Sequence, residues 1–311
     1  MARGQGGLYP PRGLHPALGR APRRGDSQRC RRPHRLVQGQ RPPLPPRELP
    51  QYPPPHAQPL GAGVIHAPLV VAWCDDLFLQ GHQLAHWITD YVDLEESLAM
   101  GSIAQEHLAH AAALLGACEM SNVERDAHVY ERPASRWFPS ELSMLPRRDW
   151  PATVAHALLM NQGLLVLRSH MQLPDKPRVQ QLAEIIKAEQ DLHARHWARW
   201  ARVFASDPGL SDEFTHRLAG AAALAVDLFG FPVSDAGPDV LLATADPAHM
   251  QRQWAEATTL VLEDAGITAP TLPDVPQPRR PGDTSDPLAR VLTELRWARG
   301  PGGVNRYEVY R

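Results

Sequence analysis

Apolar residues recur at helical spacing from residue 68 almost to the end of the chain, and this pattern constrains the fold more than any other feature. No segment alternates apolar and polar residues as a half-buried strand does. Prolines and capping residues such as Asp149 divide the pattern. It predicts helices over about 69–90, 93–119, 149–171, from after Pro177 to 205, from a cap at Ser211 to 229, 246–265 and 285–298.

The remaining stretches are predicted to be irregular. Prolines interrupt 121–149, which we expect to be a loop, and five prolines between 270 and 281 predict a linker. Residues 1–60 hold eleven arginines, two acidic residues and fourteen of the 32 prolines. Such a segment buries too little apolar surface to offset its ordering entropy. We therefore predict a disordered Arg/Pro-rich tail over 1–65 and one helical domain with a C-terminal helical extension over 66–311.

Several classes of function are disfavoured by the composition. The basic tail has no interleaved aromatic residues for base stacking, so no nucleic-acid partner is predicted. No run of eighteen apolar residues is present, so no membrane span is predicted. The three cysteines have no C-x-x-C spacing and no apolar signal segment follows the arginines, which predicts a cytoplasmic protein. Phosphate-binding loops and nucleophile elbows are also missing from the sequence.

Two predicted helices each carry a glutamate and a histidine four residues apart on a largely apolar face. The pairs are Glu106 with His110 and Glu189 with His193. Residues at i and i+4 are neighbours on a helix surface, and a buried carboxylate is costly unless it is paired or ligated. Facing pairs of this kind predict the interior of a helical bundle, where carboxylates and histidines can hold two metal ions. The four residues are the candidate metal ligands of this chain.

The ligand set is nevertheless incomplete for a di-iron centre. Such centres take a glutamate from each of two helices and Glu-x-x-His from each of the other two. Here the Glu–His spacing is four, the helix at 69–90 has no glutamate, and the centre of the helix at 149–171 carries the amides Asn161 and Gln162. As possible ligands the first helix offers Asp75, Asp76, His82 and His86 instead. We therefore interpret the Glu–His pairs as a buried polar network first and as di-iron ligands second.

Five stretches in order resemble the C-type subunit of bacterial phenylacetyl-CoA epoxidase, also called phenylacetate-CoA oxygenase. Gly-His-Gln-Leu-Ala-His-Trp at 81–87 and Leu-Glu-Glu-Ser-Leu-Ala at 94–99 are similar to its R-L-G-E-W and L-E-x-D-L-A-L-A-N motifs. The stretch 187–195 resembles K-E-A-R-Y-H-L-R, and Trp254 and 288–295 resemble the C-terminal helices. The likeness covers about residues 68–300.

This resemblance implies a ferritin-like antiparallel four-helix bundle with extra C-terminal helices. It also implies a cytoplasmic multicomponent monooxygenase that epoxidises phenylacetyl-CoA during aerobic phenylacetate catabolism. In that complex an A-type subunit holds the di-iron centre, a separate reductase supplies electrons, and the C-type subunit is a structural partner without a cofactor of its own. The chain departs from the pattern at four positions, which makes a divergent paralogue an alternative: His86 for glutamate, Ser97 for aspartate, Glu106 for aspartate and His110 for glutamine.

Three hypotheses of function follow. The first is a non-catalytic subunit that pairs with the A-type subunit. The second is a di-iron oxygenase active in its own right through Glu106, His110, Glu189 and His193. The third is a helical binding module recruited through its basic tail.

Overall fold

The computed structural model describes residues 65–90, 93–145, 149–171, 177–234, 237–242, 245–283 and 287–299. All of them belong to one compact unit, Pro54–Arg311. The predicted tail, 1–65, lies outside the described residues except for Ile65.

The regular elements of the described part of the chain are all helices, with no strand among them, so the all-α prediction is confirmed. A short 3₁₀ turn, η1 (His86–Ile88), continues the first helix. The α-helices are α1 (Pro68–Ala85), α2 (Leu94–Ala117), α3 (Asn122–Tyr130), α4 (Trp150–His170), α5 (Pro177–Ser206), α6 (Pro208–Ala223), α7 (Pro247–Asp264) and α8 (Pro287–Arg299).

Aspartate caps begin four of these helices. The carboxylates of Asp93, Asp149, Asp207 and Asp246 accept hydrogen bonds from backbone N–H groups in the first turns of α2, α4, α6 and α7. Each such cap stabilises its helix by about 0.5–2 kcal/mol relative to alanine. The prediction of Asp149 as a cap is confirmed. The prediction that Ser211 caps the fifth helix is wrong, because Asp207 and Pro208 start it earlier.

The prediction of a loop throughout 121–149 is also wrong, because α3 occupies part of it. Ser121 accepts a hydrogen bond from the backbone N–H of Glu124, and the Glu124 carboxylate accepts one from the backbone N–H of Ser121. This capping box satisfies two donors that a short helix otherwise leaves unpaired. α3 ends at Tyr130, so Pro133 lies beyond its end and does not prevent the helix.

Four helices form a closed ring in which neighbours run antiparallel. The backbone N–H of Ile65, before α1, bonds the carbonyl of Cys118, after α2. Between α2 and α5, Glu96 contacts His196 and His110 contacts Glu189, so residue numbers rise on one helix as they fall on the other. On the third side, Trp73 of α1 and Trp87 of η1 meet Gly163 and Thr153 of α4. On the fourth side, Asn161 of α4 bonds Gln190 of α5, and Trp150 of α4 lies edge to face with Trp200 of α5.

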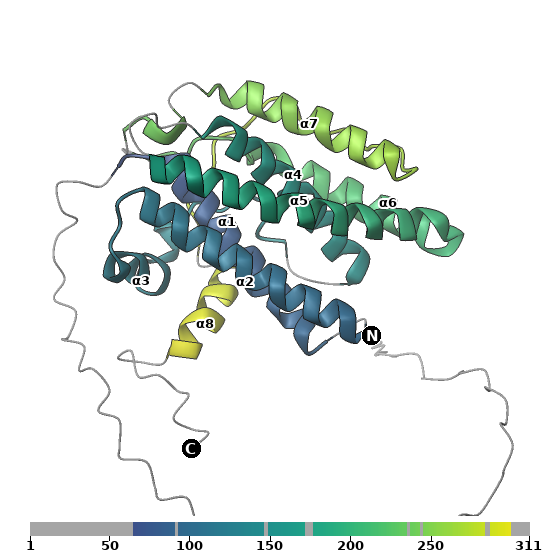
Figure 1. Cartoon of the computed structure of the whole chain (residues 1–311), viewed down its shortest axis with the longest axis horizontal. Coiled ribbons are helices and arrows are strands. Elements are labelled where there is room, and N and C mark those ends of the chain that lie inside the picture. Colours follow the sequence, from purple (N-terminus) through teal and green to yellow (C-terminus); the bar gives the residue numbers. More distant parts are fainter. Residues whose placement is uncertain are drawn as a thin grey trace, which may run out of the picture. The chain divides into compact units, whose positions relative to one another are not determined.

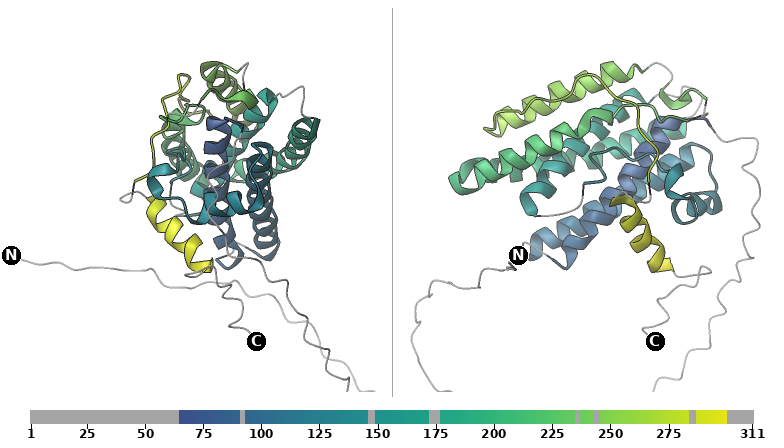
Figure 2. Two further views of the ribbon diagram at one scale, coloured as in Figure 1. Left: turned by 90° about the vertical axis from the view of Figure 1, so that its left-hand side faces the viewer. Right: turned by 180° about the vertical axis from the view of Figure 1, so that it is seen from behind.

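The connection between α2 and α4 crosses the length of this bundle, because α2 ends beside the start of α1 whereas α4 begins beside its end. A four-helix bundle with one long crossover is the ferritin-like arrangement, and that prediction is confirmed. α6 and α7 pack on the α4–α5 side, while α8 lies on the other side, against α1 and α3 (Figures 1 and 2).

Large aromatic side chains fill the core where small residues admit them. A Cβ atom on Gly163 would lie 2.6 Å from Cη2 of Trp73, so the glycine leaves room on α4 for the Trp73 indole of α1. Trp197 and Trp254 are fully buried, and the indole N–H of Trp254 donates to the carbonyl of Leu159 at 3.0 Å. Cys74 and Cys118 are buried and form no disulfide.

The predicted linker at 270–281 is a packed strap whose centre is Arg279. The guanidinium is fully buried and donates to the carbonyls of Asp227, Leu228 and Phe138. Its Nη1 atom also lies 2.7 Å from a carboxylate oxygen of Asp76 on α1. The strap therefore joins α1, the crossover and the turn after α6 at one buried cation.

Candidate functional site

The four predicted ligands meet at the line where α2 and α5 touch, but they pair across the helices and not within them. Nε2 of His193 lies 2.5 Å from Oε2 of Glu106, and Nε2 of His110 bonds Oε2 of Glu189. A carboxylate only accepts, so each imidazole donates its Nε2 proton. We call Glu106, His110, Glu189 and His193 the Glu–His seam.

The seam is buried on its histidine side and open on its carboxylate side. The side chains of His110 and His193 are 3% and 4% exposed, whereas those of Glu106 and Glu189 are 36% and 37% exposed. Partial burial, followed by repulsion from Glu189, raises the pKa of Glu106. The expectation that both residues of each pair face the core therefore holds for the histidines, while the glutamates lie at the bundle's outer edge.

Behind the seam, the bundle interior holds two further histidines that sequence reasoning did not select. His107 of α2 is buried with neither ring nitrogen hydrogen-bonded, and its ring lies 5.4 Å from that of His193. Burial is the main reason that the pKa of His107 is well below its ordinary value, and neighbouring histidines lower it further. Burial also lowers the pKa values of His193 and of His156, on α4, to about 4. At neutral pH these three imidazoles are uncharged.

Amide side chains complete the interior. Nδ2 of Asn161 donates to Oε1 of Gln190 at 2.5 Å, and Nε2 of Gln190 lies 3.2 Å from Nδ1 of His110. The chain of contacts therefore runs from α4 through Gln190 to the seam at Glu189. It holds His110 in the tautomer with its proton on Nε2, which is the tautomer that donates to Glu189.

One turn further along α5, a third glutamate, on α2, also accepts a hydrogen bond from a histidine of α5. Glu96 of α2 accepts from His196 at 2.8 Å and from the indole N–H of Trp200 at 3.0 Å. Three glutamate–histidine contacts thus connect α2 and α5 along their length, and each joins residues that are distant in sequence.

The buried faces of α2 and α5 include the predicted histidines but turn away from the predicted glutamates. The spacing Met100, Ile103, His107, His110 and Leu114 marks the most buried face of α2. The predicted face shares Ile103 and His110 with it but also passes through Glu106, Ala113 and Ala117, which are only partly buried. On α5 the buried position is likewise Gln190, next to Glu189. The larger apolar residues of each helix were the signal that could have identified the true face.

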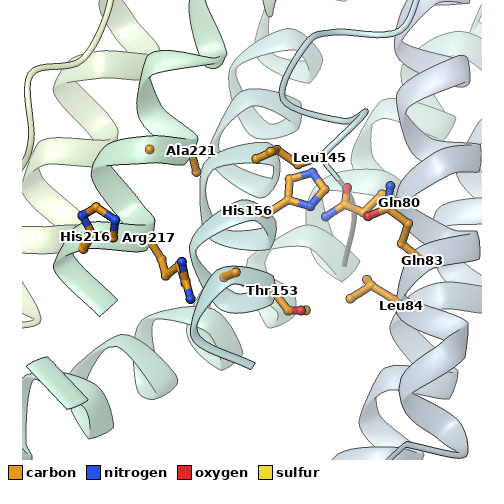
Figure 3. Close-up of a pocket in the computed structure, with 11 residues that line it drawn as sticks. Gln80, Gln83, Leu84, Leu145, Thr153, His156, His216, Arg217 and Ala221 are labelled. Carbon is orange, nitrogen blue, oxygen red and sulfur yellow. The ribbon is translucent and has the colours of Figure 1, made fainter. Parts of the chain in front are cut away.

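A pocket of about 200 Å³ opens beside His156, between α1, α4 and α6 (Figure 3). His156 of α4 and Gln80 of α1 lie next to each other on one side of the pocket. His216 and Arg217, on α6, lie on the other side (Figure 3). Nε2 of His156 and Nε2 of Gln80 are buried without a protein partner. Polar groups of this kind in a small cavity are suited to ordered water or a small polar ligand.

The donor set of the bundle does not match that of a di-iron centre. Iron pairs of this type are held by carboxylates that project inward from all four helices. Here the inward positions on α4 and α5 carry Asn161 and Gln190, which are uncharged, and the two seam glutamates are each bonded to an imidazole at the edge. Within the described ranges, three acidic or histidine ligand atoms approach within 4.8 Å of one another at His82, His86 and Glu294, outside the bundle interior.

Comparison with known proteins agrees with the fold and the sequence motifs. The model of the family described as phenylacetic acid catabolic protein matches residues 61–300. A search of curated proteins found no match. In the part of the chain that the structure describes, no helix is both long enough and apolar enough to cross a membrane. With a family match over most of its length and a ferritin-like bundle, the chain belongs to the phenylacetic acid catabolic protein family, an oxygenase-component family of phenylacetate catabolism.

Proposed function

We propose that this chain is a structural, non-catalytic subunit of a multicomponent monooxygenase resembling phenylacetyl-CoA epoxidase, and that it pairs with a di-iron subunit of A type. The observation that carries the proposal is the bundle interior, where amides and neutral imidazoles occupy the positions from which carboxylates would hold iron. In this proposal the complex is cytoplasmic and a separate reductase supplies its electrons.

The small size of the pocket beside His156 supports the proposal that the reaction takes place in the partner subunit and not in this chain. Pockets that bind drug-sized ligands measure about 300–1,000 Å³. The pocket beside His156 measures about 200 Å³, which is small for a substrate that carries coenzyme A. We therefore assign the acyl-CoA substrate to the A-type subunit.

An apolar outer face on α2 and α5 supports docking of that partner. Ile185, Leu192 and Val203 are exposed, and their spacing places them on one stripe of α5 beside the seam. On the adjacent α2, Leu94 and Leu98 are 66% and 67% exposed. Exposed apolar side chains grouped on neighbouring helices are typical of protein–protein interfaces. We propose this surface, which we call the α2–α5 face, as the contact with the A-type subunit.

Co-expression with an A-type subunit tests the pairing. The wild-type chain should co-purify with it, and Leu98→Glu with Leu192→Glu should weaken the complex at least about tenfold, because a buried unpaired charge costs several kcal/mol. Leu260→Glu, on the exposed surface of α7, is the matched control and should leave the complex intact. A wild-type chain that stays monomeric beside the A-type subunit would disprove the proposal, as would equal loss in the control.

Iron analysis separates this function from that of an independent di-iron enzyme. Protein purified from iron-replete cells should contain substoichiometric iron, because the interior lacks the usual carboxylate set. Two iron ions per chain, lost on changing Glu106 and Glu189 to glutamine, would favour the independent enzyme.

A further inference from the structure

A group of three side chains on the other side of the molecule joins the last helix to the first. His82 lies on α1, His86 begins η1 one turn later, and Glu294 comes from α8. Nε2 of His82 is 3.0 Å from Oε2 of Glu294, and Nε2 of His86 is 3.4 Å from the same oxygen. The two imidazole rings lie 5.0 Å apart at 85°.

From this geometry we infer that His82, His86 and Glu294 bind a divalent transition-metal ion of the zinc class. Histidines at i and i+4 present both imidazoles on one side of a helix, which is a spacing that zinc uses. Two histidines and one carboxylate are a zinc ligand set, with a fourth position for water. Zinc bonds of about 2.0–2.1 Å in a tetrahedron place ligand atoms about 3.3 Å apart. The two nitrogen–oxygen distances bracket that separation.

The surroundings prepare Glu294 as a ligand. Nε of Arg290 donates to Oε1 of Glu294 at 3.0 Å, so the other oxygen, Oε2, faces the histidines. Such a second contact orients a ligating carboxylate.

The position of the site is open to solvent and separate from the Glu–His seam. The side chains of His82, Glu294 and His86 are 18%, 35% and 45% exposed, so an ion can reach them from solution. Figure 2 shows α8 lying across α1, on the opposite side of the bundle from α7. A metal ion here would link α8 to α1 and η1 as a structural ion and would take no part in the oxygenase reaction. The inference does not depend on the proposed function.

Zinc titration of the full-length chain tests the site. Isothermal titration of the metal-free protein with zinc chloride should show one ion bound per chain, and zinc should raise the melting temperature because it binds the folded state. His86→Ala and Glu294→Gln should each weaken binding at least about tenfold. His249→Ala removes an exposed histidine on α7 and should bind zinc like the wild type.

Circular dichroism should show the same helix content in all variants, which separates lost ligation from lost folding. No zinc binding by the wild type would overturn the inference. Equal zinc affinity in the wild type and in a correctly folded His86→Ala, Glu294→Gln double variant would also overturn it, because the bound ion would then lie elsewhere.

Discussion

At the scale of single residues, the interior of this bundle is unusual for its neutral histidines. His107, His156 and His193 are buried, and burial lowers the pKa of each. A buried imidazole stays uncharged because the charged form loses its hydration. The free energy of unfolding therefore falls as the solution becomes acidic, because these histidines bind protons in the unfolded chain at pH values where they remain neutral in the folded one.

His156 provides the simplest test, because burial is the cause of its lowered pKa. Its pKa is about 4 in the folded protein and about 6.5 when unfolded. Its stabilisation is therefore present above about pH 6.5 and is lost as the pH falls toward 4. Between about pH 7.5 and pH 5, urea denaturation should show a loss about 2 kcal/mol smaller in His156→Gln than in the wild type.

His216→Gln, exposed on α6 at the same pocket, is the control for this measurement and should match the wild-type pH dependence. A wild-type loss that His156→Gln leaves unchanged would mean that another group carries the pH dependence.

At the scale of elements, the irregular strap contributes a buried side chain, Arg279, that holds neighbouring segments together. The strap at 270–281 follows α7, and directly after it the backbone N–H of Gly282 bonds the carbonyl of Trp137 in the crossover. Arg279 is the centre of this contact, and burial of its partner Asp76 raises the pKa of that carboxyl despite the arginine beside it. The buried ion pair therefore joins the strap to α1.

We expect Arg279→Met to destabilise the protein by about 3–5 kcal/mol, because Asp76 would remain buried without its cation. Arg280→Met is the matched control, since the side chain of Arg280 is 76% exposed and exposed ion pairs contribute about 0–1 kcal/mol. Denaturant unfolding measures both. If both variants lost a similar free energy of unfolding, the buried ion pair would contribute no more than the exposed one, and the expectation would be wrong.

At the scale of the whole molecule, stability is distributed unevenly between the bundle and α8. Most of α4 is buried in the main core. By contrast, α8 packs through Leu288 and Leu292 against a small separate cluster of Leu79, Val129 and Trp137. Local opening requires less free energy where fewer apolar contacts are broken.

Hydrogen exchange of the metal-free protein should therefore show that the amides of α8 open at a lower free energy than those of α4. Zinc should slow exchange in α8 selectively if the ion bridges α1 and α8. Amides of α8 that exchange as slowly as those of α4 without metal would contradict the unequal distribution.

Much of the helical architecture follows from local chemistry and was predictable. The caps at Asp149 and the proline-separated apolar repeats place most helices within a few residues, because these signals act over one or two turns. The capping box of α3 was present in the sequence as Ser121 and Glu124 and was overlooked beside the prolines. The Glu–His pairs correctly located the helices that meet at the seam, although their metal-binding role remains a prediction.

By itself, then, the sequence determined the fold class, most helix positions and the residues available for chemistry. Only the tertiary structure decided which partners they take: His110 bonds Glu189, 79 residues away, and His82 meets Glu294, 212 residues away. It also decided that Arg279, in a predicted linker, is fully buried. The physical reason is that a helix's sequence specifies its own faces, whereas pairing depends on the rotation and register that side-chain packing imposes between helices.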